Sequence, residues 1–135
     1  MQFFTSDDVH PSPADPKTFT GPARVARLTT GDAHASARVY RVEFGRDARL
    51  HWHEHSGVQW LFVVDGSCRV QQWGEPARDL VAGDSVCIEA GAKHWHGAAP
   101  GRTGTHIAVN LGATTTWGEE VTEEEYKGEV SRRDL

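Results

Sequence analysis

Apolar and polar residues alternate along the middle of the chain in short runs, and turn residues separate one run from the next. Residues 35–44 mix β-branched and aromatic side chains with a period of two, and residues 59–64 and 105–111 are the other long apolar runs. Shorter runs of the same kind lie at 67–73, 79–81 and 85–88. Many short strands at regular spacing, with turn signals between them, are typical of an all-β sandwich or closed barrel.

Glycine, proline and aspartate mark the breaks between these runs. The pair Asp65-Gly66 predicts a tight hairpin between the strands on either side of it. Further turns are expected at 45–48, 74–76, 82–84, 90–91 and 100–104. We find no helical period before the tail, where Thr122 and Glu125 have the spacing of a capping box and predict a short helix.

These patterns fit one domain, because 135 residues are enough for a single substantial core. Residues 1–22 are polar and rich in proline, and we expect an irregular N-terminal arm whose phenylalanines dock onto the body or onto a second subunit. The barrel itself is expected at 23–116. Residues 117–135 form a charged C-terminal tail, which we expect to be solvated.

Charge and hydropathy exclude two classes of partner. The chain has 14 basic and 19 acidic residues, whereas nucleic-acid binding needs a basic surface. No apolar run approaches the length of a membrane span, and the first ten residues lack a signal-peptide pattern, so we expect a cytoplasmic protein. Cys68 and Cys87 lie within apolar runs, where we expect reduced thiols, with a disulfide as the alternative.

Three histidines alternate along one predicted strand, and a glutamine follows them. Residues two apart in a strand point to the same face, so His51, His53 and His55 are expected on one side. Gln59 can reach that side from the start of the next strand. Neutral imidazole nitrogens and an amide oxygen that converge inside a barrel indicate a mononuclear metal site. The alternative is a strand lined by exposed histidines that bind nothing.

The strand at 35–44 offers a wall for that site. If Phe44 faces inward, Tyr40 and Val42 do so too. Tyr40 would then be either the wall of a pocket or an ordinary core residue with a satisfied hydroxyl.

Two segments resemble the paired motifs of the cupin superfamily. They are His53-x-His55-x3-Gln59-x6-Gly66 and Gly83-x5-Glu89-x-Gly91-x2-His94. Glu89 stands where that family usually has proline. A second frame, which joins Gly45 to His51 and His53, fits only the left half of the first motif, so we use the frame that begins at His53.

The resemblance implies a small antiparallel cupin barrel, also called a jelly roll, that usually forms a homodimer or higher homo-oligomer. It implies one divalent metal ion, whose ligands correspond to His53, His55, Gln59 and His94. His51 would then lie one strand step before the site. Such motifs are specific for fold and metal and not for the reaction.

Further matches narrow the resemblance to a small bacterial group that includes manganese-dependent hydroxynitrile lyases, which split cyanohydrins into an aldehyde and hydrogen cyanide. The matching segments are 19–21, 52–59, 83–84, 93–98 and 105–108. By this resemblance the substrate pocket corresponds to Tyr40, Val42 and Asn110, and the histidine of the last strand is His106. Position 40 is small in that group, so Tyr40 is expected to narrow the pocket.

The charge of the site can be argued without the family. Histidine and amide ligands are neutral, so a divalent metal keeps both charges and favours anionic ligands such as hydroxide, cyanide or an alkoxide. Manganese is favoured by the resemblance, and iron, nickel and zinc are alternatives. Cleavage of a cyanohydrin also needs a base, for which His106 is the candidate because Ala108 and Asn110 share its strand face. The alternative is a buried structural histidine.

The sequence therefore supports three functions. The first is a metal-dependent lyase that acts on a small cyanohydrin. The second is a metal-dependent dioxygenase or isomerase that acts on a small diketone, catechol or sugar acid. The third is a non-catalytic metal-binding cupin.

Overall fold

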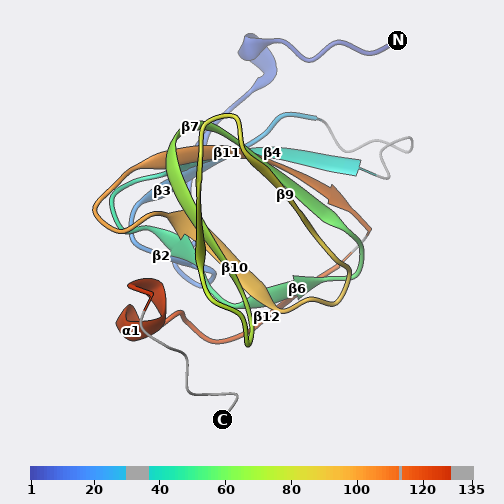
Figure 1. Cartoon of the computed structure of the whole chain (residues 1–135). Helices are drawn as coiled ribbons and strands as arrows, with labels where there is room; N and C mark the ends of the chain where they lie inside the picture. The colour runs from blue at the N-terminus through green and yellow to red at the C-terminus, as the bar shows by residue number, and fades with distance from the viewer. Residues whose placement is uncertain (30–36, 113, 129–135) are drawn as a thin grey trace.

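The computed structural model describes residues 1–29, 37–112 and 114–128, which form a nearly all-β structure (Figure 1). The strands are β1 (Ser12–Pro13), β2 (Phe19–Thr20), β3 (Ala23–Arg27), β4 (Ala37–Phe44), β5 (Arg49–Leu50), β6 (His53–His55), β7 (Gln59–Gln72), β8 (Arg78–Val81), β9 (Ser85–Ile88), β10 (His94–Ala98), β11 (Gly104–Leu111) and β12 (Thr115–Trp117). The described residues also form a 3-10 helix, η1 (Ser6–Asp8), and one α-helix, α1 (Glu123–Tyr126). Neither helix is long and apolar enough to cross a membrane.

One antiparallel sheet curls into the barrel, in the order β1-β3-β4-β11-β7-β10-β5-β2. The longest strand, β7, belongs to both halves of the barrel. Its first part pairs with β9 and β11, and its last part pairs with β8 and β10. The expectation of an all-β barrel is therefore confirmed.

The predicted hairpin at Asp65-Gly66 is wrong, because β7 continues through this pair. Gly66 has a φ of +67°, and a Cβ there would meet the carbonyl oxygen of Thr103. Beside it, the pairing with β11 shifts register between Thr105 and His106. A bulge next to glycine bends a strand and increases its twist. The pair therefore makes a corner of the barrel, at which β7 passes from one half of the sheet to the other.

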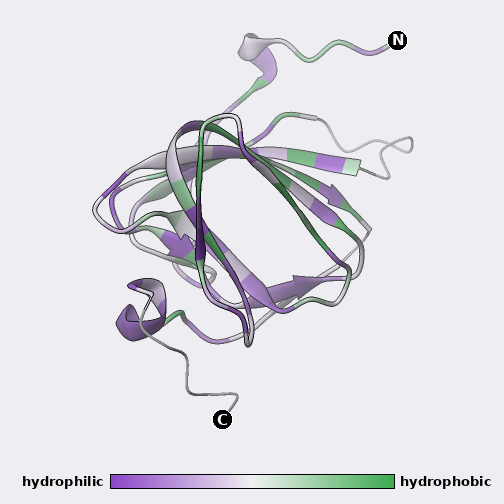
Figure 2. Cartoon of the chain, in the orientation of Figure 1, coloured by the Kyte–Doolittle hydropathy of each residue, from purple (hydrophilic) through white to green (hydrophobic). Residues whose placement is uncertain are grey.

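The strands keep the alternation that the sequence shows. Hydrophobic and hydrophilic segments follow one another along them (Figure 2). In β4, Val42 and Phe44 are buried and Arg41 is exposed. β4 begins at Ala37, and residues 35 and 36 of the predicted strand lie outside the described residues.

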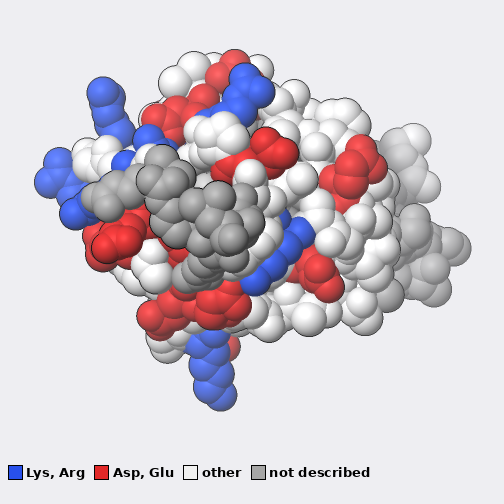
Figure 3. All heavy atoms as spheres, turned by 60° about the horizontal axis from the view of Figure 1, so that its bottom comes forward, with Lys and Arg blue, Asp and Glu red and all other residues white. Residues whose placement is uncertain are grey.

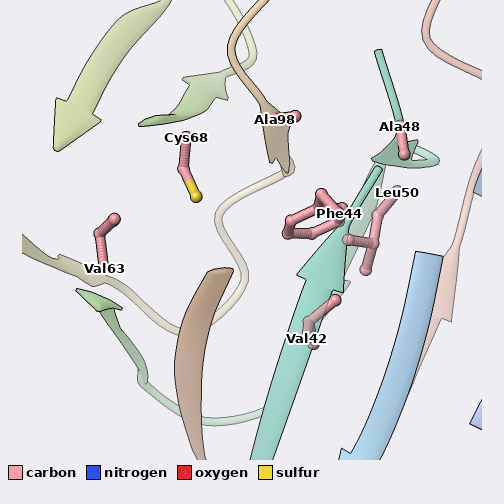
Figure 4. Packing of buried hydrophobic residues seen from close by; sticks show 7 residues of the cluster. All are labelled: Val42, Phe44, Ala48, Leu50, Val63, Cys68 and Ala98. Carbon is pink, nitrogen blue, oxygen red and sulfur yellow. The ribbon is translucent and has the colours of Figure 1, made fainter. Parts of the chain in front are cut away.

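Buried apolar side chains from several strands form one core cluster (Figure 4). Its buried members are Val42, Phe44, Ala48, Leu50, Val63, Cys68 and Ala98. The ring of Phe44 packs edge-on against the ring of His106, with centroids 5.1 Å apart. The core therefore lies directly beneath buried histidines and limits how far they can move.

The N-terminal segment is not irregular throughout. β1 pairs with β3, and β2 pairs with β5. Phe19 on β2 packs against the core cluster, 6.3 Å from the ring of Phe44. Phe3, by contrast, is 78% exposed on the part of the chain that leaves the barrel at the top of Figure 1.

Part of the C-terminal tail packs onto the barrel, so the expectation of a solvated tail is wrong for three of its residues, whereas its other described residues are exposed. Val121, Glu125 and Tyr126 are buried, and the hydroxyl of Tyr126 donates to the carbonyl oxygen of Ala98 at 2.6 Å. The predicted capping box is present, because the backbone N–H of Glu125 donates to the hydroxyl of Thr122 and the Glu125 carboxylate accepts from the Thr122 backbone. Tyr126 of the helix and Val121 just before it pack in one apolar cluster with Trp52 and Trp95.

Acidic and basic side chains lie interspersed on the face shown in Figure 3. Neither sign of charge covers that face as one continuous patch. Cys68 and Cys87 are free thiols, as expected.

Candidate metal centre

The histidine stretch does not run as a single strand. The chain bends at His51 and Trp52, and β6 begins at His53. Residues before the bend pair with β2, whereas residues after it pair with β12. The ring of His51 lies beside Glu120, with Nε2 3.8 Å from Oε1. The expectation that His51 shares a face with the next two histidines is therefore wrong.

The three histidines expected as ligands each have Nδ1 held by a neighbour. Nδ1 of His53 and of His94 each donate to the backbone carbonyl two residues earlier, at 2.7 and 2.8 Å. Nδ1 of His55 lies 3.0 Å from the hydroxyl of Thr115. Nε2 of His53 and of His55 are buried, with no hydrogen-bond partner among the described residues. Histidine ligands have this arrangement, in which an outer hydrogen bond fixes the tautomer and aims the free lone pair at the metal.

Gln59, the first residue of β7, brings an amide oxygen to the same place. Its Nε2 donates to Oδ1 of Asn110 at 2.7 Å, which turns Oε1 toward the histidines. Oε1 lies 3.0 Å from Nε2 of His94. Because Nδ1 of His94 carries the ring proton, two lone pairs face one another across this contact. A cation between them would satisfy both.

His96 adjoins these donors and could also hold a metal ion, and His106 contacts His96. Ring nitrogens of His53, His94 and His96 all lie within 4.8 Å of one another. Nδ1 of His96 is 2.8 Å from Nε2 of His106, which is fully buried. His96 lines the cavity over the site, and His106 lies behind it. The sequence predicted that His106 faces the inside of the barrel. In the structure His96 lines the cavity, and His106 contacts the His96 ring without lining the cavity itself.

Burial keeps these rings uncharged. It lowers the pKa of His94 and of His106 to about 4 each. Burial, assisted by the neighbouring rings, also holds the pKa of His53 and of His96 well below the usual value. Burial and then a nearby guanidinium lower the pKa of His55. Near neutral pH all five therefore carry lone pairs, which a metal ligand and a general base both require.

This donor set fits a divalent metal ion. It combines neutral imidazole nitrogens with one amide oxygen, and among the described residues no carboxylate lines the cavity. Imidazole-rich sites suit transition metals such as manganese, iron, nickel and zinc. Buried polar atoms normally have a partner, and a metal ion would supply one to the buried Nε2 atoms that have none among the described residues.

Three of these donors, His53, His55 and Gln59, line a cavity of about 180 Å³. Tyr40, Val42 and Asn110 lie in its wall. A dry cavity of about 150 Å³ can hold benzene, so this one has room for a small aromatic molecule. Asn110 also holds the amide of Gln59, so the wall and the donor set are joined.

Sequence reasoning missed several residues of this site, among them Arg38, Thr115 and Trp117. β12 pairs with β6 and sets Thr115 opposite His55 and Trp117 opposite His53. The ring of Trp117 lies 4.7 Å from the ring of His53. The β-branched and aromatic run of β12 has strand propensity, but three residues are too few to recognise a strand by period.

Comparison with known proteins identifies the family to which a chain with this fold and site belongs. The family model described as "Cupin domain" matches residues 38–109. This chain belongs to the cupin family. The cupin is 37% identical over 118 residues to an (R)-mandelonitrile lyase of Granulicella tundricola, a match that covers 85% of this chain and 88% of that enzyme.

Solved structures show the same architecture. A cupin-like protein from Thermotoga maritima is 38% identical, with a TM-score of 0.85 over 90% of this cupin and 95% of that chain. A putative acetylacetone dioxygenase from Methylibium petroleiphilum is 15% identical, with a TM-score of 0.72 over 88% of this cupin and 81% of that chain. The second likeness shows the fold alone. Fold and family are thereby established, and the chemistry has to be argued from the site.

Proposed function

We propose that this cupin is a metal-dependent lyase of hydroxynitrile lyase type, which splits a small cyanohydrin into an aldehyde and hydrogen cyanide. The observation that carries the proposal is a buried donor set without any carboxylate. Its proposed members are His53, His55, Gln59 and His94. The similarity to an (R)-mandelonitrile lyase supports the reaction class. We propose manganese as the metal, with iron, nickel and zinc as alternatives.

A divalent metal held by these neutral ligands would keep its full charge and stabilise the negative charge that develops as the C–C bond breaks. The amide of Gln59 preserves that charge, whereas a carboxylate would cancel one unit of it. The hydrogen bond from Gln59 to Asn110 keeps the amide oxygen toward the ligands.

His96 is the general base that takes the proton of the substrate hydroxyl. Its ring lines the cavity, its Nε2 has no hydrogen-bond partner among the described residues, and its low pKa keeps it neutral. It accepts the hydroxyl proton at Nε2 while the C–C electron pair leaves with cyanide. The proton then passes to cyanide and gives hydrogen cyanide. His106 holds the His96 ring from behind at 2.8 Å and is a positioning residue. Such a base is typically worth about a hundred- to ten-thousand-fold in rate.

The test uses the manganese-loaded protein and mandelonitrile. We expect benzaldehyde, measured by its ultraviolet absorbance, to form faster than with the metal-free protein. His96→Ala should lower the rate at least about a hundred-fold while the manganese content stays near that of the wild type. No benzaldehyde above the metal-free control would refute the proposal. A reaction that requires dioxygen would identify an oxygenase instead.

We also propose that the chain forms a homodimer through the outer face of β7 and β11. Trp60, Phe62 and Val64 are 40%, 42% and 48% exposed there. Arg41 and Glu43 on β4 carry opposite charges beside this face. A two-fold axis would bring Arg41 of one copy opposite Glu43 of the other, and Glu43 of the first opposite Arg41 of the second. Light scattering should give the dimer mass for the wild type and the monomer mass for Phe62→Glu. A monomeric wild type would refute the interface.

The state of the two cysteines indicates the cellular compartment in which the protein would work. Burial raises the pKa of Cys68 to about 12, so its thiol stays protonated and unreactive. Cys87 is also free. Free thiols are typical of reducing compartments, and we propose the cytoplasm as the location.

A further inference from the structure

Among the described residues, one arginine reaches the cavity that three of the donors line. Arg38 on β4 is half-buried and lines the same cavity as His53, His55 and Gln59. Its Nη2 donates to the carbonyl oxygen of Gly112 at 3.3 Å, which holds one edge of the guanidinium. A guanidinium has five N–H donors, so this bond leaves most of them for another partner.

The strand register connects Arg38 to the donors. Arg38 pairs with Asn110 on β11, and Asn110 pairs with Gln59 on β7. Residues directly opposite in an antiparallel sheet share a face, so these three form one row across the inside of the barrel. With strands about 4.8 Å apart, the Cα atoms at the two ends of the row are roughly 10 Å apart. The long Arg38 side chain can therefore face a molecule that also touches the donors.

The charge of Arg38 has no carboxylate partner in the described part of the chain. Arg41, Arg49 and Arg69 each lie within 4.0 Å of a carboxylate oxygen. Arg38 forms no such pair with the described residues. A half-buried charge is normally paired, and a guanidinium fork matches a carboxylate in shape.

The cavity beside Arg38 also offers an aromatic surface. Trp117 is 41% exposed at the mouth and Tyr40 lies in the wall. Phe19 and Val25 continue this apolar lining. A ligand that suits the site would be apolar or aromatic in the middle, anionic at one end and would carry a metal-binding oxygen at the other.

We propose that Arg38 is a carboxylate-binding subsite, and that the substrate of this cupin is a small, partly aromatic molecule with a carboxylate group. The assignment of the reacting carbon rests on the proposed function, but the binding of the carboxylate does not. For the lyase, the substrate would be a cyanohydrin that bears a carboxylate, and the product would be the corresponding formyl acid. Arg38 holds the carboxylate at the mouth while the hydroxyl-bearing carbon lies beside His96.

Equilibrium binding of a matched pair of probes tests the subsite. The probes are 4-formylbenzoate and its neutral amide, 4-formylbenzamide, titrated by calorimetry into manganese-loaded and into metal-free protein. Wild type should bind the carboxylate about ten-fold or more tightly than the amide in both forms, because a charge-assisted hydrogen bond is worth that much. Arg38→Gln and Arg38→Met should each lose this preference.

Arg46 provides the matched control. Like Arg38 it donates through Nη2 to a glycine carbonyl, here that of Gly101 at 3.2 Å, but it is exposed in the turn after β4. Arg46→Gln should keep the wild-type preference. Melting temperature and metal content establish that each variant is folded, and the two neutral replacements of Arg38 guard against a misfolded one.

The outcomes separate this inference from the proposed function. An unchanged preference in folded Arg38→Gln would overturn the subsite. The subsite would also be overturned if the preference disappeared on metal removal and were the same in wild type and the Arg38 variants. The carboxylate would then bind the metal directly. An Arg38-dependent preference without cleavage of either mandelonitrile or its 4-carboxylate derivative would refute the lyase and keep the subsite. Cleavage of the cyanohydrin without any preference for the carboxylate probe would keep the lyase and refute the subsite.

Discussion

The amide oxygen of Gln59 lies 3.0 Å from Nε2 of His94, and neither atom can donate a hydrogen to the other. The proton of His94 is on Nδ1, and the amide N–H of Gln59 is used by Asn110. Two ligands bound at about 2.1 Å and at right angles to one metal ion are about 3.0 Å apart. The spacing therefore matches that of two neighbouring ligands of one metal ion, which is what the proposed donor set requires.

Removal of one donor should remove the metal. We expect His53→Ala, expressed and purified with manganese, to lose most of its bound metal, measured by mass spectrometry of the elements. His51→Ala is the matched control, because its ring points to Glu120 and its backbone carbonyl, which holds His53, remains. Equal metal content in the two variants would contradict the donor set.

The charge of Gln59 should set the affinity for anions. We expect Gln59→Glu to keep the metal but to bind azide about ten-fold or more weakly, because a carboxylate cancels one unit of positive charge next to the anion. Titration of the cobalt-substituted protein, followed by its visible spectrum, measures this. Gln72→Glu, at an exposed position on the same strand, is the control. Unchanged azide affinity would refute the charge argument.

The buried histidines should make the metal-free protein sensitive to acid. His94 and His106 have folded-state pKa values of about 4, below the ordinary value of 6.5. Above pH 6.5 both states are neutral at these positions. Between pH 6.5 and about 4 the unfolded state binds more protons, so the free energy of unfolding falls as pH falls, by up to about 1.4 kcal/mol per pH unit for each group.

Urea unfolding of the metal-free protein at a series of pH values measures this loss. His106→Asn should show a smaller loss than the wild type over the same window, since one buried imidazole is gone. Stability that stays level from pH 6.5 to 4 would contradict the depressed pKa values.

The C-terminal segment should contribute to stability. Tyr126→Phe removes the hydroxyl that donates to the Ala98 carbonyl, and we expect a cost of about 1–2 kcal/mol in the free energy of unfolding. Tyr126→Ala also removes a buried ring and should cost about 3–5 kcal/mol. Glu124→Gln, at an exposed position of α1, should stay within about 0.5 kcal/mol. Urea unfolding decides, and an unaltered Tyr126→Ala would show that the segment does not hold the barrel.

Local chemistry explains what could be predicted. The period-two pattern of β4 and the start of β7 at Gln59 are properties of neighbouring residues. The capping box of Thr122 and Glu125 is likewise local. Each is visible in a short window, because side-chain direction in a strand and hydrogen bonding at a helix start depend on the next few residues.

The places where prediction failed are those where a distant partner decides. Asp65-Gly66 has the chemistry of a hairpin, but pairing of β7 on both sides of it makes a corner. The tail is charged, but Val121 and Tyr126 find an apolar surface formed by Trp52 and Trp95. A charged composition cannot show which few residues will be covered.

The sequence by itself determined an all-β structure, because alternation of apolar and polar residues is a local property of strands, and the resemblance of its two motifs to those of cupins supplied the expected set of neutral donors. Only the tertiary structure decided that a bend turns His51 away and that His96 stands in front of His106. It alone brought Arg38 and Trp117 to the same cavity. These arrangements depend on which strands pair across the curled sheet, and strand pairing joins residues that no local pattern connects.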